Sequence, residues 1–216
     1  GGKLLTQVYV AGMGTSEIAG NFIAFSIASL INLPGNALGS ASTIITGKRL
    51  GKNQVYQASI QVRHVFWLST FGLCCLALLS APLAGVLARF YTKDPEVIRV
   101  TEHLIWLNAA FMPIWATSWV LPASFKGARD ARFAMYVSMF SMWGARVVLG
   151  YLLGIYFGMG VIGVWLGMFL DWAVRGACFW WRLVSGSWLN NYRRLQAKAA
   201  AAAAKVREVP QDATEK

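Results

Sequence analysis

The most apolar part of the chain contains a small group of charged side chains. Within residues 141–176 only Arg146, Asp171 and Arg175 are charged. An arginine and an aspartate that meet inside a membrane form an ion pair, and an intramembrane carboxylate also serves to bind a proton, a cation or a substrate. Either chemistry requires that the side chains lie at the same depth.

Sequence spacing predicts that Arg146 and Asp171 do lie at the same depth. The glycines of GIYFGMG, residues 154–160, favour a turn near Gly158 and Met159. Arg146 precedes this turn by the same distance in sequence as Asp171 follows it, so the two residues are level in a pair of antiparallel helices. At about 1.5 Å per residue, both lie roughly 15–18 Å from the turn, near the middle of a bilayer.

Two interpretations of this pair compete. A lone charge at that depth costs about 2.5–3.5 kcal/mol on insertion scales, and pairing reduces the cost. A structural ion pair would set the register of the two helices, although Arg175, one turn from Asp171, competes with Arg146 as its partner. In the functional interpretation Asp171 exchanges its partner for a proton, a cation or a substrate. A neighbouring arginine favours the ionised carboxylate, so we favour the structural interpretation.

Polar and small residues follow one face of the uncharged stretch 18–47. At about 100° per residue they fall within an arc of roughly 100°. These residues are Asn21, Ser29, Asn32, Asn36, Gly39, Ser40 and Thr43. Pro34 and Gly35 interrupt the stretch, and a proline removes a backbone hydrogen bond and bends a helix. The face predicts either the lining of a wet cavity or close packing against a neighbouring helix.

The uncharged stretch 104–125 adds aromatic candidates. Trp115 and Trp119 are one helical turn apart and share a face, and aromatic faces attract flat organic rings and cations. The competing explanation is anchoring at the membrane interface, which is stronger for Trp119 because it lies closer to the end of the stretch. The complete set of substrate-cavity candidates is Asn32, Asn36, Ser40, Asn108, Trp115 and Trp119.

Sequence patterns for catalysis or metal binding are missing. TGKRLGK, residues 46–52, lacks the first glycine and the following Ser or Thr of a phosphate-binding loop. His64 and His103 are predicted near opposite membrane faces, and the cysteines have no metal-ligand spacing. We therefore expect no enzymatic activity, no metal site and no cofactor.

The composition predicts an integral membrane protein. The chain is 56% hydrophobic and only 13% charged, whereas a soluble domain of this length carries many more charges. A helix needs about 20 apolar residues to cross roughly 30 Å of hydrocarbon. We expect an all-α helical bundle of five full transmembrane helices plus the end of a truncated sixth. The expected helices cover residues of about 1–13, 18–46, 65–88, 104–125, 133–157 and 160–181.

Basic residues predict the orientation of this bundle. With two helices in 133–181, the basic segments 47–64 and 126–132 and the tail share one side, which the positive-inside rule places in the cytoplasm. A single helix at 147–170 would put the basic tail outside. The net charge of +11 therefore indicates topology, and nucleic acid is not an expected partner. Residues 1–185 form the expected transmembrane lobe, and 186–216 form a polar, alanine-rich cytoplasmic tail.

Two segments resemble a known transporter family. The first is GTSEIAGNFIAFSIASLINLPGNALGSASTIITGKRLGKN, in which a helix follows a glycine-containing turn and ends in a basic connection. The second is FKGARDARFAMYVSMFSMWGARVVLGYLLG followed by GMGVIGVWLGMF, in which a Gly-x-x-Asp connection leads into two helices joined by a glycine turn. Their order and spacing are similar to one lobe of the multidrug and toxic compound extrusion (MATE) transporters, over residues 1 to about 185.

The resemblance implies the C-terminal lobe of a two-lobe, twelve-helix secondary transporter, with the N-terminal lobe missing from this chain. It implies a multi-pass protein of the plasma membrane, the inner membrane in a bacterium. Such a protein exports small organic, often cationic, compounds in exchange for Na⁺ or H⁺ by alternating access. Some family members place acidic residues in these helices, but the stretches 18–47, 65–88 and 104–125 hold none. No coupling residue can therefore be transferred.

Two alternatives remain open. A flippase for lipid-linked sugars, from a related superfamily, would have a cationic cavity lining, and Arg146 is consistent with it. A nonfunctional or accessory membrane fragment is the other alternative. Half of a two-lobe transporter has no partner to move against, so we do not expect the isolated chain to transport.

Overall fold

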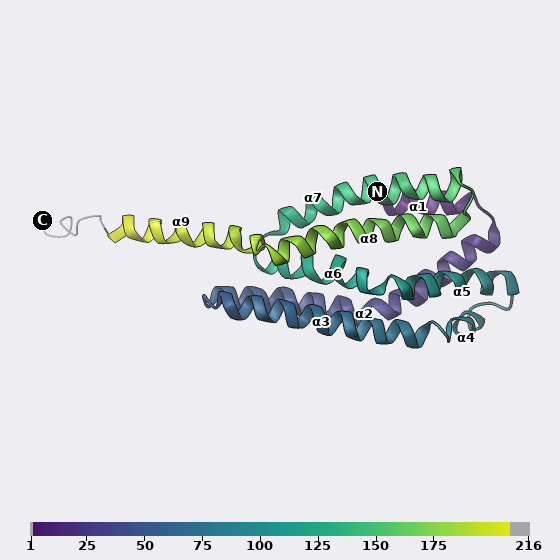
Figure 1. Ribbon diagram of the computed structural model, residues 1–216, viewed down its shortest axis with the longest axis horizontal. Helices are drawn as coiled ribbons and strands as arrows, with labels where there is room; N and C mark the ends of the chain where they lie inside the picture. The colour runs from purple at the N-terminus through teal and green to yellow at the C-terminus, as the bar shows by residue number, and fades with distance from the viewer. Residues whose placement is uncertain (1, 208–216) are drawn as a thin grey trace, which may run out of the picture.

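The protein is a bundle of long helices with one helix projecting from it (Figure 1). The computed structural model describes the backbone of residues 2–207 and the side chains of residues 5–202 and 204. The projecting helix is α9 (Asn190–Arg207), which begins after the short turn η3 (Ser187–Leu189). The part of the predicted tail beyond residue 207 lies outside the described residues.

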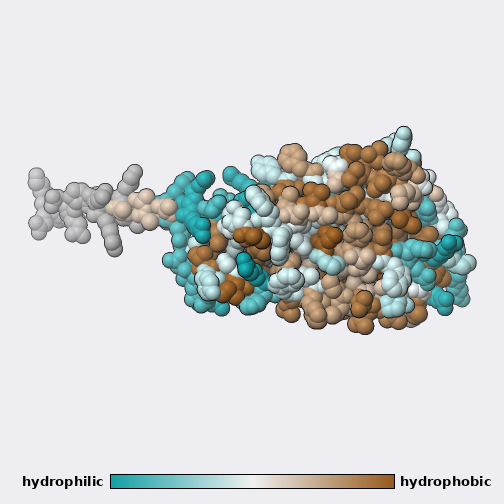
Figure 2. Space-filling view, viewed as in Figure 1, coloured by the Kyte–Doolittle hydropathy of each residue, from teal (hydrophilic) through white to brown (hydrophobic). Residues whose placement is uncertain are grey.

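The helices are long and apolar enough to make this a multi-pass membrane protein. In the described part of the chain, α2 (Thr15–Gly51), α3 (Val55–Ser80), the helical segment Ala131–Tyr156 and α8 (Gly160–Val184) each satisfy the length and hydropathy requirements for a membrane span. Figure 2 shows the expected surface on one face, with hydrophobic side chains over the middle of the bundle and hydrophilic side chains at both ends.

The fourth expected helix, 104–125, is replaced by two bent segments. Helix α5 (Pro95–Ala110) and helix α6 (Met112–Gly127) are bent by 60° at Phe111 and together satisfy the requirements for one span. Pro113 explains the break, because it has no backbone N–H to donate to the preceding turn. The expected helix began at residue 104 and so left out the first part of α5, because α5 begins in a charged segment.

The third expected helix, 65–88, also differs at both ends. Helix α3 begins ten residues earlier, at Val55, and ends at Ser80; the short helix α4 (Ala84–Arg89) follows a turn that contains Pro82. Charged and polar side chains at the start of α3 do not stop the helix, because long basic side chains reach the water from within it. A charge-free run therefore predicts where the middle of a membrane span lies better than where its helix begins and ends.

Helix α1 (Gly2–Ala11) covers most of the expected segment 1–13 and has only 10 residues. At about 1.5 Å per residue it extends roughly 15 Å, half of a bilayer core. It packs beside the last hairpin rather than crossing the bundle (Figure 1).

The last hairpin consists of α7 (Ala131–Ser141), the π-helical segments η1 (Met142–Leu149) and η2 (Leu152–Tyr156), and α8. The chain reverses at Gly158 and Gly160, whose φ angles of +67° and +60° are strained for other residues. This places the reversal where the glycine pattern predicts it. Figure 1 shows the α2–α3, α6–α7 and α8–α9 connections at one end of the bundle, and basic residues such as Lys48, Lys52 and Arg129 lie in or next to the first two of them.

Glycines allow the two halves of the hairpin to pack with their backbones in contact. A Cβ added at Gly167 would lie 2.6 Å from Gly150 Cα, and one added at Gly163 would lie 2.5 Å from the Leu153 carbonyl. Gly163 and Gly167 form one Gly-x-x-x-Gly pair, and Gly150 and Gly154 form a second one on the facing segment. The register between Arg146 and Asp171 therefore depends on a contact that larger residues would prevent.

We predict that Gly167→Ala lowers the thermal unfolding temperature of the purified protein in detergent, because its methyl group meets the Gly150 backbone. Gly72→Ala in α3 is the matched control, since nothing lies within 4 Å of its added Cβ. The control should be neutral or slightly stabilising, because alanine favours a helix over glycine by about 1 kcal/mol. Equal unfolding temperatures for the two variants would contradict the close packing of the hairpin.

Candidate substrate cavity

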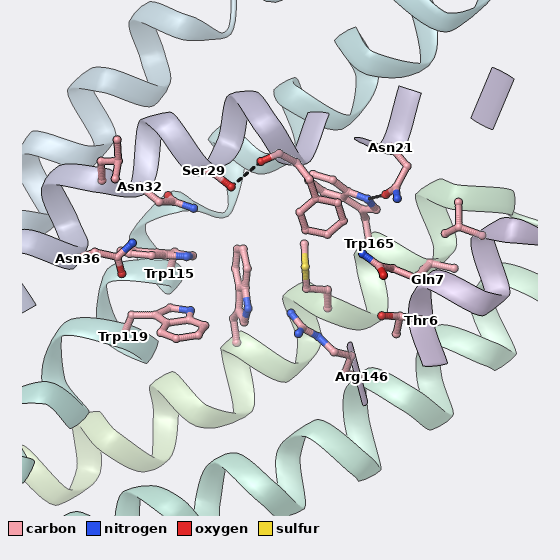
Figure 3. A pocket seen from close by; sticks show the side chains of 16 residues that line it. Thr6, Gln7, Asn21, Ser29, Asn32, Asn36, Trp115, Trp119, Arg146 and Trp165 are labelled. Atoms are coloured by element: carbon pink, nitrogen blue, oxygen red, sulfur yellow. Dashed lines mark hydrogen bonds between the residues drawn. The ribbon is translucent and has the colours of Figure 1, made fainter. Parts of the chain in front are cut away.

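A cavity of about 560 Å³ lies among α1, α2, α6, η1 and α8 (Figure 3). Among the described residues, its lining combines amide, hydroxyl and indole groups with a single ionisable side chain. The lining residues are Thr6, Gln7, Val10, Asn21, Phe25, Ser29, Asn32, Leu33, Asn36, Trp115, Trp119, Arg146, Val164, Trp165, Met168 and Trp172. The volume lies within the roughly 300–1,000 Å³ that is typical of sites for small molecules.

The polar side of the cavity comes from α2. Asn21 accepts a hydrogen bond of 2.8 Å from Trp165 Nε1, which fixes the indole of α8 against α2. Asn32 Oδ1 is buried and has no hydrogen-bond partner among the described residues. Figure 3 shows Asn32 and Asn36 one turn apart on the same side of the cavity. The amide groups therefore offer both donors and acceptors to a ligand.

The aromatic side comes from α6 and α8. The rings of Trp115 and Trp119 stack with centroids 5.9 Å apart and planes inclined by 22°. Gly35, next to Pro34 in α2, allows this stack to approach, because a Cβ there would lie 2.6 Å from the Trp115 ring. Flat aromatic ligands pack well against such surfaces.

Behind the cavity, Asp171 is completely buried and fully occupied by partners. Arg175 Nη2 donates to Asp171 Oδ2 at 2.5 Å, and the Ser141 hydroxyl donates to Oδ1 at 2.5 Å. Arg146 Nε is 3.5 Å from the same Oδ2 but makes no hydrogen bond among the described residues. The predicted Arg146–Asp171 proximity is present, but the hydrogen-bonded partner is the competitor, Arg175.

Arg146 lies between this buried group and the cavity. Its side chain is only 6% exposed, and its guanidinium points into the cavity in Figure 3. It belongs to η1, and π-helical turns are frequent at functional sites because they shift a side chain out of the α-helical register. Arg175 approaches the same carboxylate oxygen, and its guanidinium carbon is 5.5 Å from the centroid of the Trp119 ring. The charged group beside the cavity therefore consists of two arginines, Arg146 and Arg175, and one aspartate, Asp171.

Four of the six predicted cavity residues line the cavity: Asn32, Asn36, Trp115 and Trp119. Ser40 does not, because its hydroxyl is exposed and donates to the Asn36 carbonyl at 3.0 Å. Asn108 does not either, because the bend at Phe111 sends α5 in another direction and buries the amide, with Oδ1 unpartnered, away from the cavity.

Several lining residues were missed by the sequence analysis. Trp165, Met168 and Trp172 follow an i, i+3, i+7 pattern on α8, which is the same pattern that an ordinary packed helix face shows. Thr6 and Gln7 belong to the short α1, which carries too little periodicity to predict a face. Asn21 was part of the polar stripe, but its indole partner lies 144 positions away in the sequence.

An all-helical membrane bundle around a polar and aromatic cavity is an architecture typical of secondary transporters. The MatE family model matches residues 1–152, more than half of the chain, and the chain belongs to this family, the multidrug and toxic compound extrusion (MATE) transporters. Among its relatives are the uncharacterized transporter YisQ of Bacillus subtilis, 26% identical over 87% of this chain, and the probable multidrug resistance protein NorM of Mannheimia succiniciproducens, 27% identical over 83%.

Solved structures show the same fold. The chain is similar to a MOP superfamily transporter from Pyrococcus furiosus, with a TM-score of 0.78 and 20% identity over 84% of this chain and 40% of that one. It is also similar to the MATE transporter ClbM in complex with Rb⁺, with a TM-score of 0.79 and 18% identity over 88% of this chain and 45% of that one. The chain spans 41% of YisQ and 39% of NorM, so it corresponds to less than half of the relatives it matches.

We predict that Arg175→Met is the more damaging of two arginine substitutions. It leaves Asp171 without its ionic hydrogen bond, and breaking a buried pair costs about 3 kcal/mol or more. Arg146→Met should be neutral or slightly stabilising, because Asp171 keeps both hydrogen-bonding partners while one buried cation is removed. Thermal unfolding in detergent distinguishes the two. Equal losses, or a larger loss for Arg146→Met, would contradict the assignment of Arg175 as the partner.

Proposed function

We propose that this chain is one lobe, the C-terminal one, of a secondary transporter that exports small organic compounds. The observation that carries the proposal is the cavity of about 560 Å³, lined by stacked indoles and amides, in a chain of the MATE family. Relatives named multidrug resistance proteins, such as MdtK of Photorhabdus laumondii at 28% identity over 77% of this chain and 37% of its own length, support the substrate class.

In this proposal each face of the cavity has a distinct task. Trp115 and Trp119 provide a flat apolar surface for an aromatic or hydrophobic substrate, and Asn32 and Asn36 hydrogen-bond its polar groups. The second lobe closes the cavity from the other side. Movement of the two lobes about the bound substrate then exposes it alternately to each side of the membrane.

The coupling ion, Na⁺ or H⁺, is proposed to bind outside this cavity. Among the described lining residues none is acidic. Asp171 is occupied by Arg175 and Ser141, and Glu17 lies close to the hairpin turn at Gly160 rather than in the cavity. A carboxylate of the other lobe is therefore the favoured site of coupling.

We propose that the chain runs through the membrane with its basic end in the cytoplasm. The basic connections between α2 and α3 and between α6 and α7, together with the start of α9, lie at one end of the bundle (Figure 1). The positive-inside rule favours the cytoplasm for this end. In a bacterium the corresponding membrane is the inner membrane.

A lipid-linked sugar flippase is the second candidate, and the observation that favours it is Arg146 in the cavity. A cationic lining would suit a pyrophosphate headgroup. The similar transporter from Pyrococcus furiosus is described as having a binding pocket of reversed polarity that suggests a different function. A vesicle-based flipping assay with a fluorescent lipid pyrophosphate would distinguish the flippase from an exporter of soluble compounds.

The export proposal predicts transport of small dyes by the full-length protein in proteoliposomes. We expect uptake or release of ethidium or 8-anilinonaphthalene-1-sulfonate that depends on an imposed Na⁺ or H⁺ gradient. Trp115→Ala should reduce the transport rate at least tenfold, because it removes half of the aromatic stack. Trp67→Ala is the control, since this indole lies on the exposed outer surface of α3. No movement of either dye under either gradient would contradict the proposed function.

A further inference from the structure

We propose that the cavity selects organic anions, namely aromatic compounds that carry a carboxylate or sulfonate, through Arg146. This inference rests on the proposed export function and specifies its substrate class. It depends on three properties of the cavity: the charge of its lining, the freedom of the Arg146 guanidinium, and the position of that guanidinium relative to the aromatic surfaces.

The first property is an excess of positive charge. Arg146 is the sole ionisable side chain among the described residues that line the cavity. Behind it, Asp171 neutralises only one of two arginines, so Arg146, Asp171 and Arg175 together carry a net charge of +1. One positive charge in excess is costly for a buried group at membrane depth. A bound organic anion would supply the missing negative charge, whereas an organic cation would be repelled.

The second property is that Arg146 is available to a ligand. Asp171 receives its hydrogen bonds from Arg175 and Ser141, each at 2.5 Å. Arg146 makes no hydrogen bond among the described residues, and its Nε, 3.5 Å from Asp171, is buried without a hydrogen-bond partner. Asp171 thus stabilises the charge of Arg146 without occupying its donors. A guanidinium in this state suits a carboxylate or sulfonate, which accepts two parallel hydrogen bonds from it.

The third property is the arrangement of polar and aromatic groups around the guanidinium. Figure 3 shows Arg146 pointing into the cavity from the side opposite Asn32 and Asn36, and Trp115 and Trp119 lie on the same side as these two asparagines. Trp172 adds a second buried donor, because its Nε1 has no hydrogen-bond partner among the described residues. A flat ring against the indoles with its anionic group at Arg146 would therefore offer hydrogen-bond acceptors to Arg146 and Trp172, whose Nε and Nε1 have none among the described residues.

The test compares three compounds of the same shape on the full-length protein in detergent. They are 2-naphthoate, which is anionic, 2-naphthamide, which is neutral, and 2-naphthylmethylammonium, which is cationic. Isothermal titration calorimetry of the unmodified protein should give the tightest binding for 2-naphthoate, at least tenfold tighter than for the cation. Equal or tighter binding of the cation would overturn the proposal without any variant.

Variants then assign the selectivity to Arg146. Arg146→Gln should weaken 2-naphthoate at least tenfold and change 2-naphthamide by less than twofold, and Arg146→Lys should retain a preference for the anion. Arg63→Gln, which removes an exposed arginine of α3, is the matched control and should change neither affinity. Unchanged 2-naphthoate binding in Arg146→Gln, or loss of the anion preference in Arg146→Lys, would overturn the proposal.

The transport assay keeps this inference separate from the proposed function. Transport of 8-anilinonaphthalene-1-sulfonate in preference to ethidium supports both. Transport of ethidium alone leaves the export function standing and overturns the anion selectivity. Charge-selective binding of 2-naphthoate that depends on Arg146, together with no transport of either dye, supports the site and contradicts the export function.

Discussion

Asp171 can form a strong ionic hydrogen bond with only one of its two arginine neighbours, and the rest of the site depends on which one it is. A buried carboxylate requires hydrogen bonds and a counter-charge, and Arg175 and Ser141 provide them at 2.5 Å each. Because this requirement is met on one side, Arg146 is held near the carboxylate at 3.5 Å while its guanidinium lines the cavity. As a result, the positive charge of Arg146 is stabilised by Asp171, and its guanidinium can still bind a ligand in the cavity.

The hairpin geometry is what makes this arrangement possible. Two facing pairs of glycines bring the backbones of η1–η2 and α8 together, and this contact sets the register in which Ser141 on one segment meets Asp171 on the other. The π-helical turns around Arg146 then determine where its side chain points. On the opposite side, Gly35 lets α2 approach Trp115, so that glycines position both the charged and the aromatic walls of the cavity.

Sequence reasoning predicted the class of fold and part of the site. Apolar runs and charge bias are properties of the chain itself, so the membrane bundle follows from them. Asn32, Asn36, Trp115 and Trp119 were found because each pair repeats at helical spacing. The choice between Arg146 and Arg175 as the partner of Asp171 could not be made, because both lie within reach and the π-helical turns have no recognised sequence pattern.

Asn108 was misplaced because the 60° bend at Phe111 redirects its helix. Trp165 was missed since a cavity face and a packing face show the same periodicity.

The most direct test of this account is a structure of the full-length protein bound to 6-bromo-2-naphthoate, in which the bromine marks the ring by anomalous scattering. We predict the carboxylate within hydrogen-bonding distance of the Arg146 guanidinium, the ring against Trp115 and Trp119, and Asp171 still bonded to Arg175 and Ser141. A ligand bound away from Arg146, with the Arg146 guanidinium instead hydrogen-bonded to Asp171, would contradict the account.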